Sequence, residues 1–225
     1  SGVYVFDAAL LRDALGKIDS NNDQGEMYLT NVVGILRNSG HAISAVVTDS
    51  QNILGVNDRR QLAQAGQVLR ERITDQWMLA GVTMVDPNSV WIDRTVTIEP
   101  DVTLLQNVQL TGSTSIKSGS VIGPDCTITD TVVDNDASVI RSTTIDSHIG
   151  KGATVGPFTY LRPGTKLGPK AKAGGFVEMK NATLGEGAKV PHLSYVGDAQ
   201  IGQGSNIGAA TVFVNYDGQE KHKTV

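Results

Sequence analysis

Apolar side chains recur at every sixth position over more than half of the chain. The first run comprises Ile98, Leu104, Leu110, Ile116, Ile122 and Ile128, and it restarts in phase at Val133, Val139 and Ile145. The second run comprises Ile149, Val155, Leu161, Leu167, Ala173, Met179, Leu184, Val190, Val196, Ile201, Ile207 and Phe213. A period of six matches neither the 3.6-residue helix nor the two-residue alternation of a strand. It is typical of a parallel β-helix, in which three six-residue units (hexads) make one triangular coil and the aliphatic residue points inward.

Small residues favour the same architecture. Glycine often follows the aliphatic residue, as in Ile122-Gly123 and Val155-Gly156, and it permits the turns at the corners of a coil. The fifth place of the hexad is usually small, and its occupants include Thr114, Ser120, Ala153, Thr165, Ala171, Ala188, Ser205 and Thr211. Because no single hexad buries its apolar face, stacked coils must supply the core. The alternative is a chance run in an ordinary β-rich domain.

The first 80 residues follow another pattern. Residues 3–6 and 42–47 are predicted strands, while residues 8–17 and 29–36 have the spacing and apolarity of helices. Alternating strands and helices suggest part of an α/β domain. So few elements bury little surface, and the chain begins at Ser1 without a methionine. We therefore expect a fragment of a longer protein.

A helix is predicted to connect this piece to the β-helix. Its apolar residues share one helical face; they are Leu62, Ala65, Leu69, Ile73 and Trp77. Gly81 marks its end, since glycine commonly follows the last helical turn. The expected organisation is an α/β piece over residues 1–56, a linker helix over 57–81 and a β-helix over 82–225.

Composition narrows the possible functions. The net charge of −4 argues against a general nucleic-acid binder. A single cysteine excludes an internal disulfide and fits a reducing compartment. That residue, Cys126, occupies the small fifth place of its hexad, so we interpret it as a buried small side chain. There is no membrane-span-length apolar stretch and no visible signal peptide, so a cytoplasmic location is expected.

Two cations in the later hexads suggest an anion site. Arg162 and Lys180 are 18 residues apart, which is one full coil of three hexads. If that coil length holds there, they lie on the same face, about 4.8 Å apart along the stack. Stacked cations can bind an anion such as a phosphate. The alternative is two solvated surface charges.

His192 is the candidate general base. It occupies the third place of its hexad, which should point out of the coil, and histidine exchanges protons near neutral pH. Tyr195 lies three residues on, and Glu178 lies roughly one coil earlier, where it could orient the ring. The alternative is a lone exposed histidine. The other histidines show no zinc-ligand spacing.

Asn57 precedes the predicted linker helix and has two interpretations. It is either the helix N-cap or a polar ligand at the edge of a nucleotide site. Its position alone favours the cap.

Several motifs together resemble a known enzyme family. They are residues 22–30 (NDQGEMYLT), 55–59 (GVNDR), 79–82 (LAGV), 156–164 (GPFTYLRPG), 176–180 (FVEMK), 192–198 (HLSYVGD) and 215–218 (NYDG). In this order, across the whole chain, they resemble the bacterial bifunctional N-acetylglucosamine-1-phosphate uridylyltransferase / glucosamine-1-phosphate N-acetyltransferase. The resemblance implies a Rossmann-like uridylyltransferase domain, a helical arm and a left-handed β-helix that forms a homotrimer.

The resemblance also implies residue roles. His192 matches the base that deprotonates the glucosamine amine. Matches to sugar-phosphate and sugar contacts are Arg162, Lys180, Tyr195, Asn206 and Lys221. In the family's trimer, Lys221 could also contact a neighbouring subunit. Matches to the acetyl-CoA site are Ala209, Asn215 and Tyr216. Asn57 matches a ligand of Mg²⁺ and nucleotide.

The family's glycine-rich nucleotide loop, its metal aspartate and its last coils have no counterpart in this sequence. The expected function is therefore acetyl transfer from acetyl-CoA to glucosamine 1-phosphate, with uridylyl transfer from UTP only in an intact parent protein. The alternatives are another sugar-directed hexapeptide acyltransferase, or a non-catalytic trimerisation scaffold.

Overall fold

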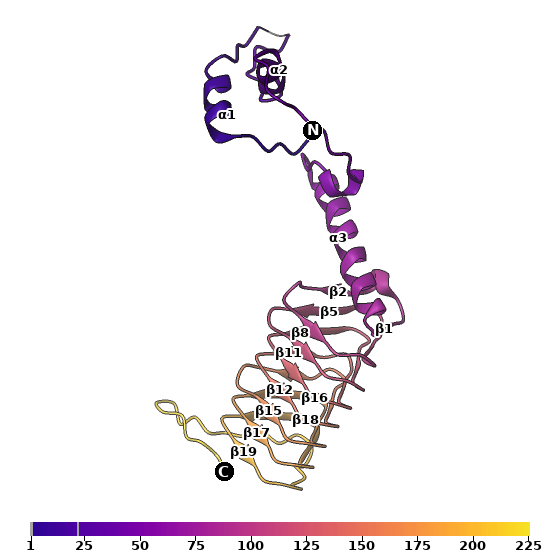
Figure 1. Ribbon diagram of the computed structural model, residues 1–225. Coiled ribbons are helices and arrows are strands. Elements are labelled where there is room, and N and C mark those ends of the chain that lie inside the picture. The colour runs from indigo at the N-terminus through magenta and orange to yellow at the C-terminus, as the bar shows by residue number, and fades with distance from the viewer. Residues whose placement is uncertain (1, 22) are drawn as a thin grey trace. The chain divides into compact units, whose positions relative to one another are not determined.

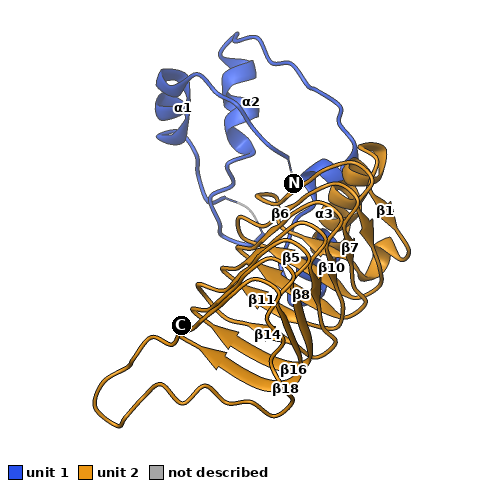
Figure 2. Cartoon of the chain, turned by 90° about the horizontal axis from the view of Figure 1, so that it is seen from below, with its two compact units in different colours: residues 1–65 blue, residues 66–225 orange. Residues whose placement is uncertain are grey.

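The fold is dominated by a solenoid of short parallel strands (Figure 1). The structure is a computed structural model that describes residues 2–21 and 23–225. Ser1, and Asn22 at the start of the first family motif, lie outside the described residues. The described chain divides into two compact units, residues 1–65 and 66–225, coloured separately in Figure 2.

The first unit is small and helical. It contains α1 (Ala8–Leu15), α2 (Asn31–Asn38), the 3₁₀ turn η1 (Ser50–Ile53) and the start of α3 (Arg59–Leu79). The carboxylate of Asp7 caps α1 by accepting from the amide of Ala9 at 2.9 Å. Its core is limited to Ala14, Val32 and Leu36 with a few partly buried neighbours. Both predicted helices are confirmed, with α2 shifted by two residues.

The two strands predicted in this unit are wrong. Residues 3–6 and 42–47 are irregular, and no strand occurs among the described residues of the first unit. A strand needs a neighbour to accept its backbone hydrogen bonds, and neither segment has one here. The Rossmann-like character of this piece is therefore not shown.

The second unit is a left-handed β-solenoid of about seven turns. Its strands form three parallel stacks, one on each face of the coils. The first stack contains β1 (Thr83–Met84), β4 (Thr103–Leu104), β7 (Val121–Ile122), β10 (Ser138–Val139) and β13 (Thr154–Val155). The second contains β2 (Trp91–Ile92), β5 (Val108–Thr111), β8 (Cys126–Thr129), β11 (Thr143–Ile145) and β14 (Tyr160–Leu161). The third contains β3 (Thr97–Ile98), β6 (Ser115–Ile116), β9 (Val132–Val133), β12 (His148–Ile149), β15 (Lys166–Leu167), β17 (Thr183–Leu184) and β19 (Gln200–Ile201).

Two longer strands, β16 (Lys172–Lys180) and β18 (Lys189–Gly197), continue through a corner and so belong to both the first and second stacks. A short 3₁₀ turn, η2 (Pro87–Ser89), lies in the first coil. The long parallel β16–β18 pair is visible in both ribbon views.

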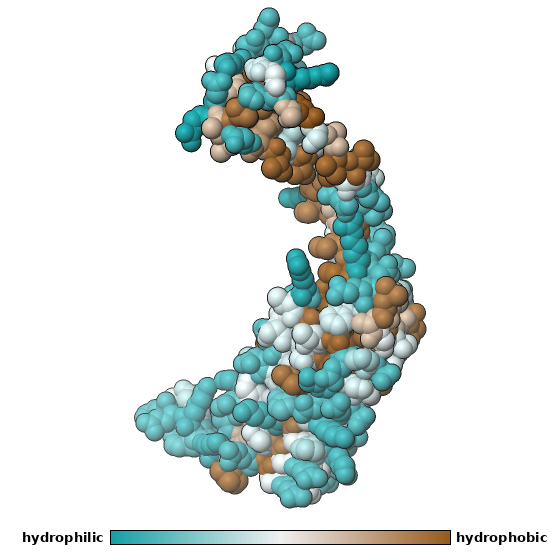
Figure 3. Space-filling model, viewed as in Figure 1, coloured by the Kyte–Doolittle hydropathy of each residue, from teal (hydrophilic) through white to brown (hydrophobic). Residues whose placement is uncertain are grey.

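The strand register stacks the inward-pointing aliphatic residues of successive coils on one another. On the first face, Leu104 pairs with Ile122, Ile122 with Val139, and Val139 with Val155. All four are buried. Their strand neighbours, such as Val121 beside Ile122, point outward, and the face seen in Figure 3 is accordingly mostly hydrophilic or intermediate over the coils.

One position of the predicted ladder is wrong. Thr144, not Ile145, pairs with Ile128 and is fully buried. The coil is shorter here, so the period-2 alternation of the strand turns the neighbouring residue inward. The hydroxyl of Thr144 bonds to that of Thr131 at 3.3 Å inside the core, which satisfies the buried polar group.

The C-terminal half of α3 closes the first coil. Ile73 and Trp77 pack against the solenoid core, and the guanidinium of Arg70 lies 4.7 Å from the ring centroid of Trp91. Leu62 and Leu69, predicted on the same helical face, are exposed. Among the described residues, no helix has the length and apolarity needed to cross a bilayer.

The inward ladder generates a stability prediction. Ile122→Ala should lower the free energy of unfolding by about 2–5 kcal/mol, because a fully buried aliphatic side chain leaves a cavity that stacked coils cannot fill. The adjacent Val121→Ala, which removes an outward side chain from the same strand, is the matched control and should cost far less. Urea denaturation measures both. Equal losses would contradict the inward–outward assignment.

Candidate functional site

Arg162 and Lys180 lie on the same face, as the sequence predicts. Strands β14 and β16 pair Tyr160 with Glu178 and Leu161 with Met179, so the next residues, Arg162 and Lys180, are also opposite each other. The amide of Arg162 donates to the carbonyl of Met179 at 2.8 Å and fixes this register. The two cations are therefore held by the backbone ladder of a rigid solenoid.

Glu178 orients Arg162. Its Oε1 accepts from Nη1 of Arg162 at 2.8 Å, and both side chains are partly exposed. This hydrogen bond raises the pKa of Arg162 further. A partly exposed pair of this kind adds little stability, so its main consequence is to fix the direction of the guanidinium.

Lys180 faces a second lysine. Lys221 reaches it from the C-terminal segment, and the contact between the two ammonium groups, opposed by nearby Asp198, lowers the pKa of Lys180. Like charges in contact disfavour their protonated forms. A bound anion would relieve this repulsion. Arg162, Lys180 and Lys221 therefore form a candidate anion site, called the cation cluster below.

A pocket of about 370 Å³ lies beside this cluster. Its lining includes Lys166, Lys221 and Lys223, with Asp198 as an acidic member. Lys180 and His192 do not line it. The pocket therefore extends the positive surface next to the cluster and does not contain the candidate base.

His192 is exposed on β18, as predicted, and pairs with Gly175 of β16. The expectation that Glu178 orients its ring is wrong. Glu178 pairs with Tyr195, and its carboxylate binds Arg162. The physical reason is the corner in these strands, since His192 precedes it and Tyr195 follows it on the next face.

Tyr195 is half-buried on the face that carries Glu178. Its ring lies against Gly197, where any side chain would collide with the Tyr195 hydroxyl. The glycine therefore makes the space that the tyrosine occupies. Tyr195 is thereby placed one coil from Glu178, the residue that holds Arg162.

Asn206 and Ala209 lie on the last coil and are exposed. The backbone of Lys189 forms a parallel β-bridge with that of Asn206, and the backbone of Tyr195 forms one with that of Val212. The same offset along the chain places Ala209 next to His192. The structure thus brings these two predicted residues to the coil that follows the candidate base.

Asn215 and Tyr216 begin a hairpin-like excursion after the last coil, seen at the C-terminal end in Figures 1 and 2. The side-chain amide of Asn215 donates to the carbonyls of Gly197 and Asp198. Tyr216 bridges to Lys221 in antiparallel fashion. Asn215 therefore ties the excursion to β18, and the bridge brings Lys221 back toward the coils.

The sequence motif at residues 215–218 includes Asp217, but the resemblance implies no role for this residue, which organises the excursion. Its carboxylate accepts from the amides of Gln219 and Glu220 at 2.8 and 2.7 Å and from Nε2 of His222 at 2.8 Å. Chiefly through the Glu220 amide, these bonds lower the pKa of Asp217 to about 2. The Asp217-Gly218 dipeptide, a common turn signal, was the available clue.

Asn57 is not the cap of the linker helix. The carboxylate of Asp58 caps α3 by accepting from the amide of Gln61 at 2.7 Å, and the Gln61 side chain accepts from the Asn57 amide at 2.6 Å. Helix α3 begins at Arg59, so the cap falls one residue later than predicted. The metal and nucleotide role of Asn57 stays a prediction.

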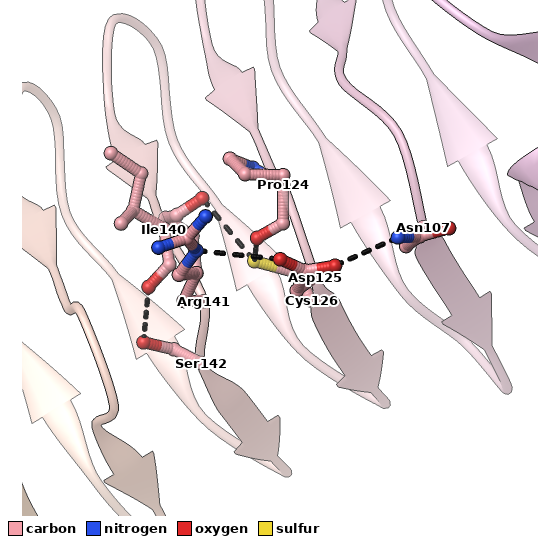
Figure 4. A network of polar contacts seen from close by, with 8 residues as sticks. Asn107, Pro124, Asp125, Cys126, Ile140, Arg141 and Ser142 are labelled. Atoms are coloured by element: carbon pink, nitrogen blue, oxygen red, sulfur yellow. Dashed lines mark hydrogen bonds and ion pairs between the residues drawn. The ribbon is translucent and has the colours of Figure 1, made fainter.

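Cys126 is buried, as predicted. Figure 4 shows its thiol beside the carbonyl of Pro124. Burial raises the pKa of its thiol. The thiol contacts the carbonyls of Pro124 and Val139, so Cys126 serves the corner of a coil.

Comparison with known proteins agrees with the motif pattern. No protein-family model matches the chain. The bifunctional protein GlmU of Corynebacterium diphtheriae is 56% identical over 225 residues, and that of Streptomyces griseus is 57% identical over 225 residues. Both matches cover 100% of this chain.

The chain is similar to GlmU along its whole length. It spans about half the length of these GlmU relatives, 46% and 47% respectively. Among solved structures, the Arabidopsis UDP-N-acetylglucosamine acyltransferase is 14% identical with a TM-score of 0.47, covering 57% of this chain and 61% of that one.

The cation cluster generates a binding prediction. If the cluster binds the phosphate of glucosamine 1-phosphate, Lys180→Ala should weaken binding of that ligand by about 1.5–3 kcal/mol, the usual value of a charge-assisted contact, and leave acetyl-CoA binding nearly unchanged. Lys172→Ala is the matched control, because Lys172 is an exposed lysine at the other end of β16. Calorimetry of each ligand measures the difference. Equal losses for both ligands, or no loss for either, would contradict a specific phosphate contact at Lys180 and favour a solvated surface charge.

Proposed function

We propose that the C-terminal coils bind glucosamine 1-phosphate and transfer to its amine the acetyl group of acetyl-CoA. The observation that carries this proposal is the cation cluster, whose Lys180 lies on β16, together with the exposed His192 on the paired strand β18. A phosphate monoester satisfies three crowded cations, and Arg162 is already oriented by Glu178. The GlmU relationship agrees with a sugar phosphate as the anion.

In this proposal, Arg162, Lys180 and Lys221 bind the phosphate. Tyr195 contacts the sugar, since it pairs with Glu178, which holds Arg162. Asn206 lies opposite Lys189 on the first face, and its sugar contact is proposed from the motif resemblance. Phosphate binding on a rigid surface orients the sugar amine toward the thioester. The reaction between the two bound substrates then becomes effectively unimolecular.

His192 is the proposed general base. The neutral imidazole accepts a proton from the amine as the amine nitrogen attacks the thioester carbonyl of acetyl-CoA. The tetrahedral adduct then collapses with loss of the CoA thiolate, which takes up a proton, and the products are the acetamide and CoA. The exposed position of His192 permits this contact, and its backbone lies in the long β16–β18 pair.

Ala209, Asn215 and Tyr216 are the proposed acetyl-CoA contacts. Ala209 lies next to His192 on the following coil, which would place the thioester beside the base. Asn215 and Tyr216 lead into the excursion that returns Lys221 to the cation cluster. The donor and acceptor sites therefore share one segment of chain.

The base assignment predicts a large kinetic effect. In a GlmU-length protein that contains this chain, His192→Ala should lower acetyl transfer by about two to four orders of magnitude, the usual contribution of a general base. His148→Ala, which removes another exposed histidine on the third face, should have no effect. Thiol release measures the rate. A rate within tenfold of wild type would exclude His192 as the base, while no transfer in the wild type would favour a scaffold.

Uridylyl transfer and the homotrimer are proposals for the GlmU-length protein. Mg²⁺ favours octahedral sites with carboxylate ligands, and Asn57 supplies one amide oxygen. Among the described residues, no group of three histidine, cysteine, aspartate or glutamate side chains could hold a metal ion. The residues present therefore do not fit a complete magnesium site.

This mismatch predicts that the 225-residue chain alone releases no pyrophosphate from UTP and N-acetylglucosamine 1-phosphate, with or without added Mg²⁺. The physical reason is that phosphoryl transfer needs a phosphate-binding loop and a positioned metal ion. A coupled pyrophosphate assay measures it, with a GlmU-length relative as the positive control. Turnover by this chain would show that another part of it holds the metal.

A further inference from the structure

Several corners of the solenoid are closed by the same side-chain hydrogen bond. At each of these corners one residue has the left-handed backbone conformation. The side chain of the next residue donates to the carbonyl of the residue that precedes the left-handed one. The donors are Cys126, Thr131, Ser142, Ser147 and Ser194, and the left-handed residues are Asp125, Asp130, Arg141, Asp146 and Leu193. Figure 4 shows two examples, at Cys126 and Ser142.

At Ser194 the carbonyl that accepts this bond belongs to His192. The Ser194 hydroxyl donates to it at 2.9 Å and accepts from the amide of Thr211 at 3.3 Å. Ser194 is only 4% exposed. One buried hydroxyl therefore fixes the peptide of the candidate base and joins it to the next coil, which carries Ala209.

The corner needs this closure because its backbone conformation is unfavourable. Leu193 has a φ of 51°, and a branched side chain rarely adopts that region. Such conformations persist only when surrounding contacts enforce them. Without the hydroxyl, the His192 carbonyl and the Thr211 amide lose these part-buried hydrogen bonds together, and the corner beside His192 is the part that can relax.

We propose that Ser194 is a positioning residue for His192. It holds the His192 backbone so that the imidazole is presented at a fixed place relative to the following coil. This inference rests on the proposed role of His192 as the base. It assigns Ser194 no contact with substrate, so its effect must pass through His192.

The chain supplies a matched control at another corner. Ser142 is 5% exposed, donates to the carbonyl of Ile140 at 2.6 Å and accepts from the amide of Thr159 at 3.2 Å. It follows Arg141, which has a φ of 42°. Ser142→Ala therefore removes the same pair of hydrogen bonds at a corner that holds no histidine. Ser194→Thr is the conservative variant, because Thr131 makes the same bond to the carbonyl of Thr129.

We expect Ser194→Ala to lower kcat for acetyl transfer about ten- to a hundredfold, the cost of a small misplacement of a catalytic group. The KM for acetyl-CoA should stay unchanged. Ser142→Ala should lower the melting temperature as much as Ser194→Ala and leave kcat at the wild-type value. Ser194→Thr should recover most of the lost rate. In the His192→Ala background, Ser194→Ala should cause no further loss, because the two changes act on one step.

NMR of the four histidine rings gives a readout that needs no activity, with the His192 signal assigned from its loss in His192→Ala. Ser194→Ala should shift and broaden that signal, and Ser142→Ala should not. Equal kinetic losses for the two serine variants, or an unchanged His192 signal in Ser194→Ala, would overturn the positioning role. Full acetyl transfer by His192→Ala would instead overturn the proposed function, so the two failures are distinguishable.

Discussion

The parallel backbone ladder between successive coils is the constraint on which the rest of this structure depends. Each coil must return to the same three faces so that every short strand finds its partner one coil away. Two-residue strands such as β13 cannot persist alone, because isolated strands leave their hydrogen bonds unmade. Stacking satisfies these bonds and buries the inward ladder in the same step. The side chains of Arg162 and Lys180 are consequently placed by backbone register and need no support from loops.

Corners are where this constraint is most demanding, because the chain must turn sharply without losing a coil-to-coil bond. Glycine solves the problem at some corners, and at others an ordinary residue adopts the left-handed region. A buried hydroxyl or thiol then bonds to the preceding carbonyl, as at Ser142 and Cys126. This hydrogen bond satisfies a corner carbonyl that has no partner in a neighbouring strand. It also fixes the backbone from which an outward side chain such as His192 projects.

The period of six was sufficient to predict the β-helix, because the inward residue must recur at each face of each coil. It could not locate Thr144, since a shortened coil changes which neighbour faces inward and hydrophobicity alone favours Ile145. The strands predicted near the N-terminus failed for a different reason. Alternation and β-propensity describe a residue's fitness for a sheet, whereas a strand exists only where a partner accepts its bonds.

The candidate site was predictable to the extent that it lies on the ladder. Counting hexads brought Arg162 and Lys180 together, but it also suggested that Glu178 orients His192, because counting ignores the corner between them. The approach of Lys221 to Lys180 depends on a segment outside the repeat, where Asn215 and Asp217 fix the path of the chain. Periodicity carries no information about such a segment. The repeat thus positions Arg162 and Lys180 of the cation cluster, whereas local side-chain hydrogen bonds position Lys221. Because Lys180 and Lys221 repel each other, a bound anion would stabilise their close approach.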